Sequence, residues 1–515
     1  MTPSSRRDFL RVTVGAAAAA GALPAFPAHG ARKPNLLFLW TDEQRPDTIA
    51  VYGNRRIQAP NLSKLASESM VFRNAYDTQP VCTPARSSIL TGLWPHQNGC
   101  TQNNVALAEN VPTLPKLMGD ADYRTGYFGK WHLGDEVFAQ HGFEEWRSIE
   151  DGYWKYYREG RDANARSSYS DWLRVLNYTP DTSRGDFSRD FASRLPIEHC
   201  KPSYLGQEAC DFLRRHRDEP FILHVNYLEP HMPFWGPLND LHKLEDIQFP
   251  PNFEDPLEEN EPMSYRFRAK KYAGMYDERF DLAAAAGWRR LIANYWGLVS
   301  QIDRSVGGIL TTLEELGLAE DTIVVFTSDH GDMMGSHHLV EKGYMYQEAM
   351  RVPLLIRAPG QGRKQQIVEG HVSQIDLVPT LLDLMGGKAN ATLPGKSLVP
   401  LMKGETQATE PVFVEWNAPA EMPEGPNPEG AKRDTAKTAG PSSRAVIMPD
   451  GWKLVLHDKD QHQLYNLEKD SGETKNMYGE RESREVVTRL SGEIQRWQER
   501  VGDTLRIGEG AVTMS

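Results

Sequence analysis

The chain has few cysteines, no excess of positive charge and no long apolar run beyond its first residues. Its four cysteines are too few for a disulfide-framework protein and lack the C-x-x-C spacing of a structural zinc site. Whether Cys200 and Cys210 form a single disulfide stays open. Lys and Arg number 58 against 70 Asp and Glu, a net charge of −12, which argues against nucleic-acid binding because that requires a basic surface. An anionic ligand would therefore have to meet locally clustered cations.

The N-terminus has the composition of an export signal. Residues 5–10 (SRRDFL) resemble the twin-arginine consensus, and the Ala-rich apolar run Val12–Phe26 follows them. The run is short for a membrane span, and the small residues Ala28 and Gly30 suit a cleavage point. An uncleaved anchor or a disordered tail are the alternatives. We expect residues 1–31 to be removed after export by the twin-arginine machinery, which places the chain in the periplasm or outside the cell, without stable membrane insertion.

Three short apolar runs predict buried strands of one sheet. Each is almost continuously hydrophobic and rich in branched or aromatic residues, as a strand covered on both faces is: Asn35–Trp40, Phe221–Tyr227 and Thr322–Thr327. Between and after them, helical periodicity appears in Asn61–Met70, Trp288–Leu316, Asp376–Met385 and Ser483–Val501. The alternation predicts an α/β fold with a large, mostly parallel central sheet flanked by helices.

The pattern changes after about residue 400. Three runs indicate antiparallel strands, the last two joined by a Pro-Asp-Gly turn: Val412–Trp416, Arg444–Met448 and Trp452–His457. With the last helix they predict a smaller α+β subdomain that contains an antiparallel sheet. The expected organisation is a signal at 1–31, a main domain at 32–400 and the C-terminal subdomain at 401–515. We expect Tyr153–Asp190 and Glu245–Asp281 to be irregular insertions and Asn417–Ser443 to be a long loop.

Each of the three predicted strands of the main domain ends in a cluster of polar residues. The clusters are 41–45 (TDEQR), 229–231 (EPH) and 328–332 (SDHGD). Ligands of open α/β sheets bind just beyond the carboxyl ends of the strands. Ordinary polar loops explain one such cluster but poorly explain three. The sequence therefore predicts that carboxylates and histidines meet at one rim of the sheet.

The stretch Cys82–Gly92 (CTPARSSILTG) has the most specific pattern in the chain. Pro84 suits the first turn of a helix, which would put Cys82 at the helix N-terminus, where the dipole and free N–H groups favour anions. Arg86 lies one turn further and can lean back toward the same spot. Cysteine is often only a small core residue, but the neighbouring Pro and Arg argue against that alternative.

The motif C-x-P-x-R, followed by a Ser-rich helix and Thr-Gly, resembles the signature of the type I, formylglycine-dependent sulfatases of the alkaline phosphatase-like superfamily. Further blocks resemble that family in the family's order: TDEQRPD at 41–47, GKWHLG at 129–134, EPHMP at 229–233, SDHGDMMG at 328–335 and RVPLLIRAP at 351–359. The resemblance spans nearly all of the mature chain. It implies that a formylglycine-generating maturation enzyme oxidises Cys82 to Cα-formylglycine, and that the chain hydrolyses a sulfate ester and releases inorganic sulfate.

The resemblance also implies a metal site. In relatives of this kind one divalent ion, here expected to be calcium, contacts four side chains and the residue-82 oxygen, which correspond to Asp42, Glu43, Cys82, Asp329 and His330. Hard oxygen ligands suit such an ion, which polarises both the sulfate and the hydrated aldehyde.

The family positions of five cationic or titratable residues imply their roles. Lys130 and Lys342 would hold sulfate oxygens, and Arg86 would support the hydrated aldehyde. His132 is the expected base of the step that expels sulfate, because imidazole titrates near neutrality. His231, together with Lys342, would protonate or stabilise the departing alkoxide.

Two other functions remain open from the sequence. Formylglycine-dependent phosphonate or phosphate ester hydrolases of the same superfamily also carry an Asp-His pair like Asp329-His330. A secreted, inactive glycan-binding protein would instead keep residue 82 as cysteine. Export and aromatic insertions fit a sulfated carbohydrate as the substrate, although these aromatic side chains fit core packing equally well: Tyr153, Trp154, Tyr156, Tyr157, Trp172 and Trp235.

Overall fold

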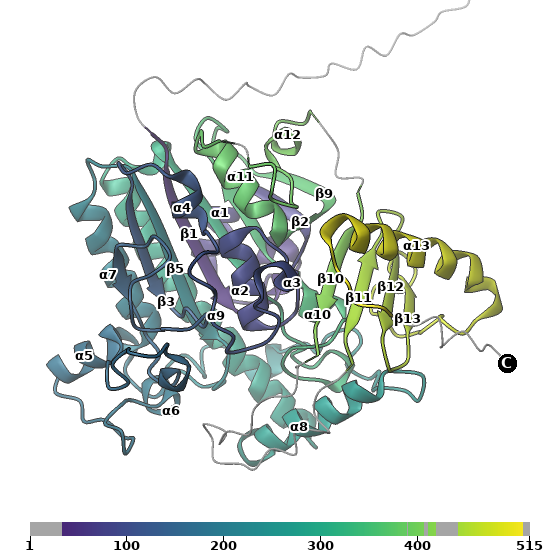
Figure 1. The fold of residues 1–515 in the computed structure, drawn as a ribbon. Coiled ribbons are helices and arrows are strands. Elements are labelled where there is room, and N and C mark those ends of the chain that lie inside the picture. The colour runs from purple at the N-terminus through teal and green to yellow at the C-terminus, as the bar shows by residue number, and fades with distance from the viewer. Residues whose placement is uncertain (1–32, 389, 406–409, 419–440, 508–515) are drawn as a thin grey trace, which may run out of the picture.

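Figure 1 shows the computed structural model of the chain, which describes residues 33–388, 390–405, 410–418 and 441–507. The predicted signal at 1–31 and most of the predicted loop Asn417–Ser443 lie outside the described residues. Within the described ranges, no helix has both the length and the apolar character needed to cross a bilayer.

A nine-stranded mixed sheet, sheet A, forms the centre of the larger part of the molecule (Figure 1). Its strands follow the order β4-β3-β5-β1-β6-β8-β2-β7, and β9 also pairs with β2. The first five of these run parallel to one another, whereas β8 is antiparallel to both β6 and β2. In chain order the strands are β1 Asn35–Asp42, β2 Met70–Tyr76, β3 Arg124–Gly129, β4 Glu145–Arg147, β5 Phe221–Pro230, β6 Thr322–Ser328, β7 Arg351–Val352, β8 Leu354–Arg357 and β9 Gln366–Ser373.

The two faces of β1 belong to two different hydrophobic clusters. Leu37 and Leu39 face one layer of helices, while Leu36, Phe38 and Trp40 face the other, because successive side chains of a strand point to opposite sides. The first layer contains α1 Pro60–Ser67, α7 Lys201–Arg215 and α9 Ala285–Glu315; the second contains α2 Cys82–Thr91, α4 Leu114–Met118 and α11 Leu377–Leu384. The predicted parallel sheet between helices is therefore confirmed.

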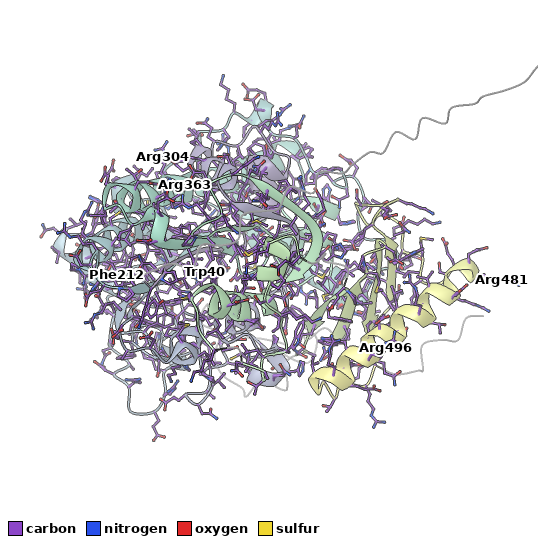
Figure 2. All side chains as sticks on the ribbon, turned by 90° about the horizontal axis from the view of Figure 1, so that it is seen from above. Trp40, Phe212, Arg304, Arg363, Arg481 and Arg496 are labelled. Carbon is purple, nitrogen blue, oxygen red and sulfur yellow. The ribbon has the colours of Figure 1, made fainter. Side chains whose placement is uncertain are left out.

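A separate antiparallel sheet, sheet B, forms the C-terminal part. Its order is β10-β11-β12-β13, with bounds Val412–Trp416, Ser443–Ile447, Trp452–His457 and Gln463–Asn466. Helix α13, Arg484–Val501, lies across it and contributes Trp497 to the core between them (Figure 1). Seen from above, Arg496 projects from the outer edge of α13, whereas Trp40 is fully buried in the body of sheet A (Figure 2). The predicted antiparallel subdomain is confirmed.

The sequence-based reading of Glu245–Asp281 as irregular is wrong for its second half. Residues Met263–Phe280 form an 18-residue helix, α8, below sheet B in Figure 1. Its apolar side chains do not gather on one face: Tyr265 and Tyr276 are buried, whereas Phe267 is 54% exposed. The weak periodicity concealed the helix, which tertiary contacts stabilise.

The remaining helices are short. They are α3 Pro95–Asn98, α5 Ser168–Val175, α6 Arg189–Ser193, α10 Gln347–Met350 and α12 Val399–Met402. Helices α5 and α6 belong to the insertion Tyr153–Asp190 and the residues after it. Cys200 and Cys210 are both free thiols, so no disulfide joins them.

Candidate active site

The register of three neighbouring strands brings the three predicted polar clusters together. Thr41 of β1 pairs with Ser328 of β6, and Asp42 pairs with Pro230 of β5. The strands end at the same rim, so the residues that follow each of them face a common space. The predicted convergence of the three clusters is what this register produces.

Cys82 is the first residue of α2, as its sequence context predicts, and it is 1% exposed. Its Sγ lies 3.5 Å from Asp42 Oδ1 and 3.4 Å from His330 Nε2. Burial, reinforced by Asp42, raises the pKa of the thiol well above its usual value. A cysteine at this position is therefore protonated, and a neutral thiol is a weak nucleophile.

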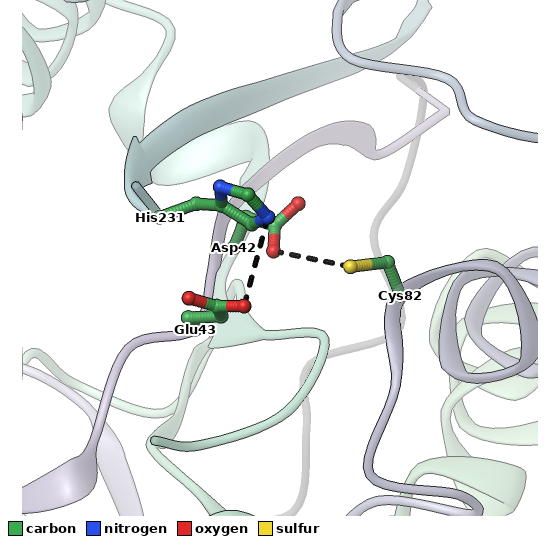
Figure 3. A group of neighbouring side chains, drawn as sticks. All are labelled: Asp42, Glu43, Cys82 and His231. Atoms are coloured by element: carbon green, nitrogen blue, oxygen red, sulfur yellow. Dashed lines mark hydrogen bonds and ion pairs between the residues drawn. The ribbon is translucent and has the colours of Figure 1, made fainter. Parts of the chain in front are cut away.

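Two overlapping groups of side chains here could hold a metal ion. Asp42, Cys82, Asp329 and His330 form one, and Asp42, Glu43, Cys82 and His231 form the other (Figure 3). Within each group the ligand atoms lie within 4.8 Å of one another. Oε2 of Glu43 is buried without a hydrogen-bond or ion-pair partner, whereas Oε1 of Glu43 pairs with Lys342 and Oδ2 of Asp329 pairs with Arg86. Buried carboxylates with unused acceptor capacity fit a divalent cation, and the imidazole of His330 broadens the range of metals.

Two buried cations balance Asp42. Arg86 Nη2 and Lys130 Nζ lie 2.6 Å and 2.5 Å from Asp42 Oδ2. Arg86 Nε also lies 3.0 Å from Asp329 Oδ2. Although burial opposes ionisation, Lys130 and Arg86 hold the pKa of Asp42 well below its usual value. Asp42 therefore stays ionised, which suits a metal-binding site.

Glu43 follows Asp42 in the chain and is fully buried. Its carboxylate forms an ion pair with Lys342 and lies 3.6 Å from His231 Nε2 (Figure 3). Its backbone N–H donates to Asp329 Oδ1 at 3.1 Å. Glu43 thus joins the residues predicted to act on the leaving group to those predicted to bind the metal.

His132 is held beside the N-terminus of α2. Its carbonyl accepts from Thr83 Oγ1 at 2.7 Å, and its backbone N–H donates to Glu136 at 2.6 Å. Its Nε2 lies 2.9 Å from Asn104 Oδ1, an acceptor, so Nε2 carries the proton and Nδ1 carries the lone pair. Nδ1 is buried without a partner. Burial and then Lys130 lower the pKa of His132 well below its usual value, so the imidazole is neutral and able to accept a proton.

His231 is a second neutral imidazole in the site. Burial, followed by Lys130, lowers its pKa well below the usual value, and Nδ1 is 2.9 Å from the carbonyl oxygen of Met232. An N–H at Nδ1 leaves Nε2 free on the side of Glu43. Both histidines are therefore neutral before a ligand binds.

Backbone strain marks two of these residues. Glu43 and His132 have φ angles of 67° and 59°, in the left-handed region that side chains other than glycine rarely adopt. Such conformations cost about 1–3 kcal/mol each and concentrate at functional sites, where surrounding contacts enforce them. The hydroxyl of Tyr295 holds the backbone of Glu43 in this conformation by donating to its carbonyl oxygen at 2.5 Å.

Three further residues, which the sequence did not single out, hold side chains of the site in place. Asn226 accepts from Arg86 Nη1 at 2.6 Å, Asn104 fixes the tautomer of His132, and Glu136 holds its backbone. A signal existed for Asn226, the one amide within the apolar run Phe221–Tyr227. Asn104 and Glu136 lie in loops, where an isolated polar residue carries no such signal.

Comparisons with known proteins identify the family. Residues 34–387 match the Sulfatase family model. The chain is 29% identical over 486 residues to the uncharacterized sulfatase YidJ of Escherichia coli, covering 92% of this chain and 89% of that protein. It is 26% identical to an N-acetylglucosamine-6-O-sulfatase of Bacteroides thetaiotaomicron, covering 88% and 84%. The solved structure of a phosphonate monoester hydrolase from Silicibacter pomeroyi superposes with a TM-score of 0.73 at 23% identity, covering 91% and 95%.

Proposed function

The chain belongs to the sulfatase family and is a sulfuric ester hydrolase, and from this premise we propose that it cleaves a sulfated carbohydrate with a formylglycine made from Cys82 and a bound calcium ion. The observation that carries the proposal is the position of Cys82. Its side chain starts at a helix N-terminus and points between Asp42 and His330, amid two buried cations. A buried, protonated thiol would be a poor nucleophile at this position, and this supports the proposal that Cys82 is converted to formylglycine.

A formylglycine at residue 82 would supply a hydrated aldehyde. One hydroxyl would attack sulfur as the S–O bond to the substrate alcohol breaks, and the other would then lose its proton as the C–O bond to the sulfate breaks, which restores the aldehyde. The side chains around it have distinct tasks. Lys130 and Arg86 keep positive charge beside the incoming sulfate, and Lys342 adds a third cation on the side of Glu43. The unpartnered Nδ1 of His132 is the site that takes the proton in the expulsion step.

The leaving oxygen needs a proton on the opposite side of the sulfate. His231 Nε2 and Lys342 Nζ both lie at Glu43, so this is where that proton is held and delivered. The neutral state of His231 assigns the resting proton to Lys342. Entry of an anionic sulfate favours a protonated His231, because a nearby negative charge raises the pKa of an imidazole.

The metal ion would rest on Asp42, Asp329 and His330, with Glu43 as the fourth side chain, and would add Lewis-acid polarisation of the sulfate. The oxygen-rich donor set supports calcium. Dialysis against a chelator should remove activity, and titration with calcium should restore it. Recovery with manganese or zinc but not with calcium would assign the ion differently.

Mass spectrometry tests the nucleophile. The tryptic peptide that contains residue 82 should be lighter by ~18 Da than the cysteine form, a change fixed by covalent chemistry. Release of inorganic sulfate from a panel of sulfated oligosaccharides with defined sulfate positions then tests the substrate class. An unmodified Cys82 in an enzyme purified with its maturation partner would contradict the proposal and favour an inactive glycan-binding protein.

The presence of a histidine, His330, in the metal group favours a second candidate, hydrolysis of phosphonate or phosphate esters. The fold is compatible with it, because a phosphonate monoester hydrolase shares the architecture. Kinetics on an aryl sulfate and a phosphonate monoester, measured side by side, separate the two. A higher kcat/KM for the phosphorus substrate would reverse the assignment.

A further inference from the structure

The insertion that begins at Tyr153 places one aromatic ring on the face of His132. The ring centres of Tyr153 and His132 lie 4.4 Å apart, with 35° between the two planes. The sequence left open whether Tyr153 packs in the core or contacts a sugar. In the structure the half-buried Tyr153 instead contacts the imidazole that we assign as the base in the expulsion of sulfate.

The backbone of His132 does not fix the direction of its ring. The residue lies in the loop after β3 and has a φ of 59°, outside any regular element. The contact of Nε2 with Asn104 at 2.9 Å holds one edge of the imidazole. A contact at one edge still lets the ring turn about the Cβ–Cγ bond, a torsion with broad preferences in histidine. The ring of Tyr153 restricts that rotation, because it lies against the face of the imidazole.

Tyr153 is itself held by charged side chains of other elements. Arg189 of α6 donates from Nη2 to the Tyr153 hydroxyl at 2.9 Å and from Nε to Glu150 at 2.7 Å. The side chain of Glu150 is 4% exposed and also pairs with Lys201 of α7. The contacts from Lys201 through Glu150 and Arg189 therefore tie the ring on His132 to a helix that packs on sheet A.

A cation–π contact anchors the turn that follows Tyr153. Tyr153 directly precedes the short 3-10 helix Trp154–Tyr156. The guanidinium of Arg184 lies 4.1 Å from the ring centre of Trp154, within the range of a favourable contact. Tyr153 is thus held through its hydroxyl by Arg189 and through its backbone by an anchored turn.

We propose that Tyr153 is a positioning residue for the second step of the reaction, the expulsion of sulfate from residue 82. The inference rests on the proposed function. In that step Nδ1 of His132 takes the proton of the remaining residue-82 hydroxyl, while the C–O bond to sulfate breaks and sulfate leaves with the electron pair, which restores the aldehyde. Tyr153 keeps Nδ1 directed at that proton, and the π face of its ring attracts the imidazolium that forms.

Steady-state kinetics of Tyr153→Leu with 4-nitrophenyl sulfate test this assignment. The good leaving group of this ester makes the first step fast, so the second step limits the rate. Because the alcohol leaves in the first step, kcat/KM is independent of the second step, whereas kcat depends on it. We expect kcat and KM to fall together by about tenfold or more, because a positioned general base contributes about 10²–10⁴-fold to such a step. An unchanged kcat would overturn the proposal.

A pre-steady-state measurement identifies the slowed step. Rapid mixing of Tyr153→Leu with 4-nitrophenyl sulfate should give a burst of 4-nitrophenol equal in amount to the enzyme, followed by slow turnover, because sulfate stays on residue 82. General damage to the fold would lower kcat and kcat/KM together without a burst, and thermal melting checks for it. A raised KM with the parental kcat would make Tyr153 a substrate-binding residue. Either result overturns the proposal.

Two matched variants separate the ring from its surroundings. Tyr153→Phe keeps the ring on His132 and loses only the hydroxyl that accepts from Arg189, so its kcat should lie much closer to that of the parent than the kcat of Tyr153→Leu does. Tyr156→Leu removes another half-buried tyrosine of the same insertion and should keep the parental kcat and KM. Equal losses in Tyr156→Leu and Tyr153→Leu would assign the effect to the insertion as a whole and overturn the role of this ring.

The chemical state of residue 82 separates this inference from the function on which it rests. If mass spectrometry of the parent finds cysteine there, the proposed function fails and the inference fails with it. If residue 82 is formylglycine and Tyr153→Leu keeps the parental kcat, the proposed function stands and only the role of Tyr153 fails. A parent that carries formylglycine but does not turn over 4-nitrophenyl sulfate is assayed in the same way with the sulfated oligosaccharide that it hydrolyses.

Discussion

The rim of sheet A and the interior of sheet B both bury charged side chains, but they satisfy them differently. In sheet B, Lys453 pairs with Glu473, both fully buried, and Glu473 also accepts from the backbone of Gln347 at 2.6 Å. At the rim of sheet A, Oε2 of Glu43 and Nδ1 of His132 are buried without a hydrogen-bond partner. Burial of charge alone therefore does not distinguish the two regions. The two regions differ in unused hydrogen-bonding capacity, because a folded protein keeps buried polar atoms without partners mainly where a ligand binds them.

The same contrast appears in Arg444, whose guanidinium lies on β11. Its nitrogens bond to both oxygens of Asp503, to Asn417 and to two backbone carbonyls. A residue so completely bonded holds elements together and has nothing left for a ligand. His132, whose Nδ1 is buried without a partner among the described residues, has that capacity.

The largest effect on activity should come from Cys82→Ala. Removing the proposed nucleophile should lower kcat by about 10⁴-fold or more, in the range of nucleophile deletions in other hydrolases. The protein should stay folded, because a small side chain replaces a small one, and circular dichroism with thermal melting checks this. Unfolding of the variant would instead make Cys82 a structural residue.

Lys453→Met should have the largest effect on stability. It leaves Glu473 buried without its cation, and breaking a buried pair in this way costs about 3–5 kcal/mol. Urea denaturation followed by intrinsic fluorescence measures the loss. The double variant Lys453→Met with Glu473→Gln should recover most of it, since the amide keeps an acceptor for Gln347. A single variant as stable as the parent would remove the contrast between the regions.

Lys342→Ala should reduce activity more than it reduces stability. The loss of one cation from the site should reduce kcat/KM about 10²–10³-fold, the usual size for removing one group that stabilises a transition state. The urea midpoint, measured with calcium present, should fall less than in Lys453→Met, because Glu43 would keep His231 at 3.6 Å and the proposed metal ion as partners. A large fall in stability with unchanged kcat/KM would place Lys342 with Lys453 as a structural residue.

The smallest effect concerns pH. Burial lowers the pKa of His457 from 6.5 to about 4, so this histidine is neutral in the fold and takes up a proton on unfolding. Protonation of His457 in the unfolded state therefore does not affect the free energy of unfolding above pH 6.5. As the pH falls toward 4 it lowers that free energy, by about 2 kcal/mol at pH 5. His457→Gln should flatten the acid side of the stability profile by that amount. An unchanged profile would mean that other groups dominate the acid sensitivity.

Much of the fold was predictable because it is encoded locally. The apolar runs became β1, β5 and β6, and the antiparallel strands after residue 400 became β10, β11 and β12. Helix α8 was missed because its apolar residues do not follow one face, so its stability comes from contacts with distant parts of the chain. The disulfide left open between Cys200 and Cys210 is absent, since Cys210 instead contacts Thr312 of α9 at 3.2 Å.

The candidate site also combines features that the local sequence encodes with features that depend on the tertiary structure. The sequence by itself determined the candidates for the chemistry, since the motif and the strand ends single out Cys82, Asp42 and Asp329. Only the tertiary structure decided their pairing: Glu43 with Lys342, Arg86 with Asn226, and Arg189 beside His231. These pairs depend on strand register and on loop packing between segments far apart in the chain. The local periodicity of the sequence does not determine the distances between these side chains, which are set only when the sheet forms.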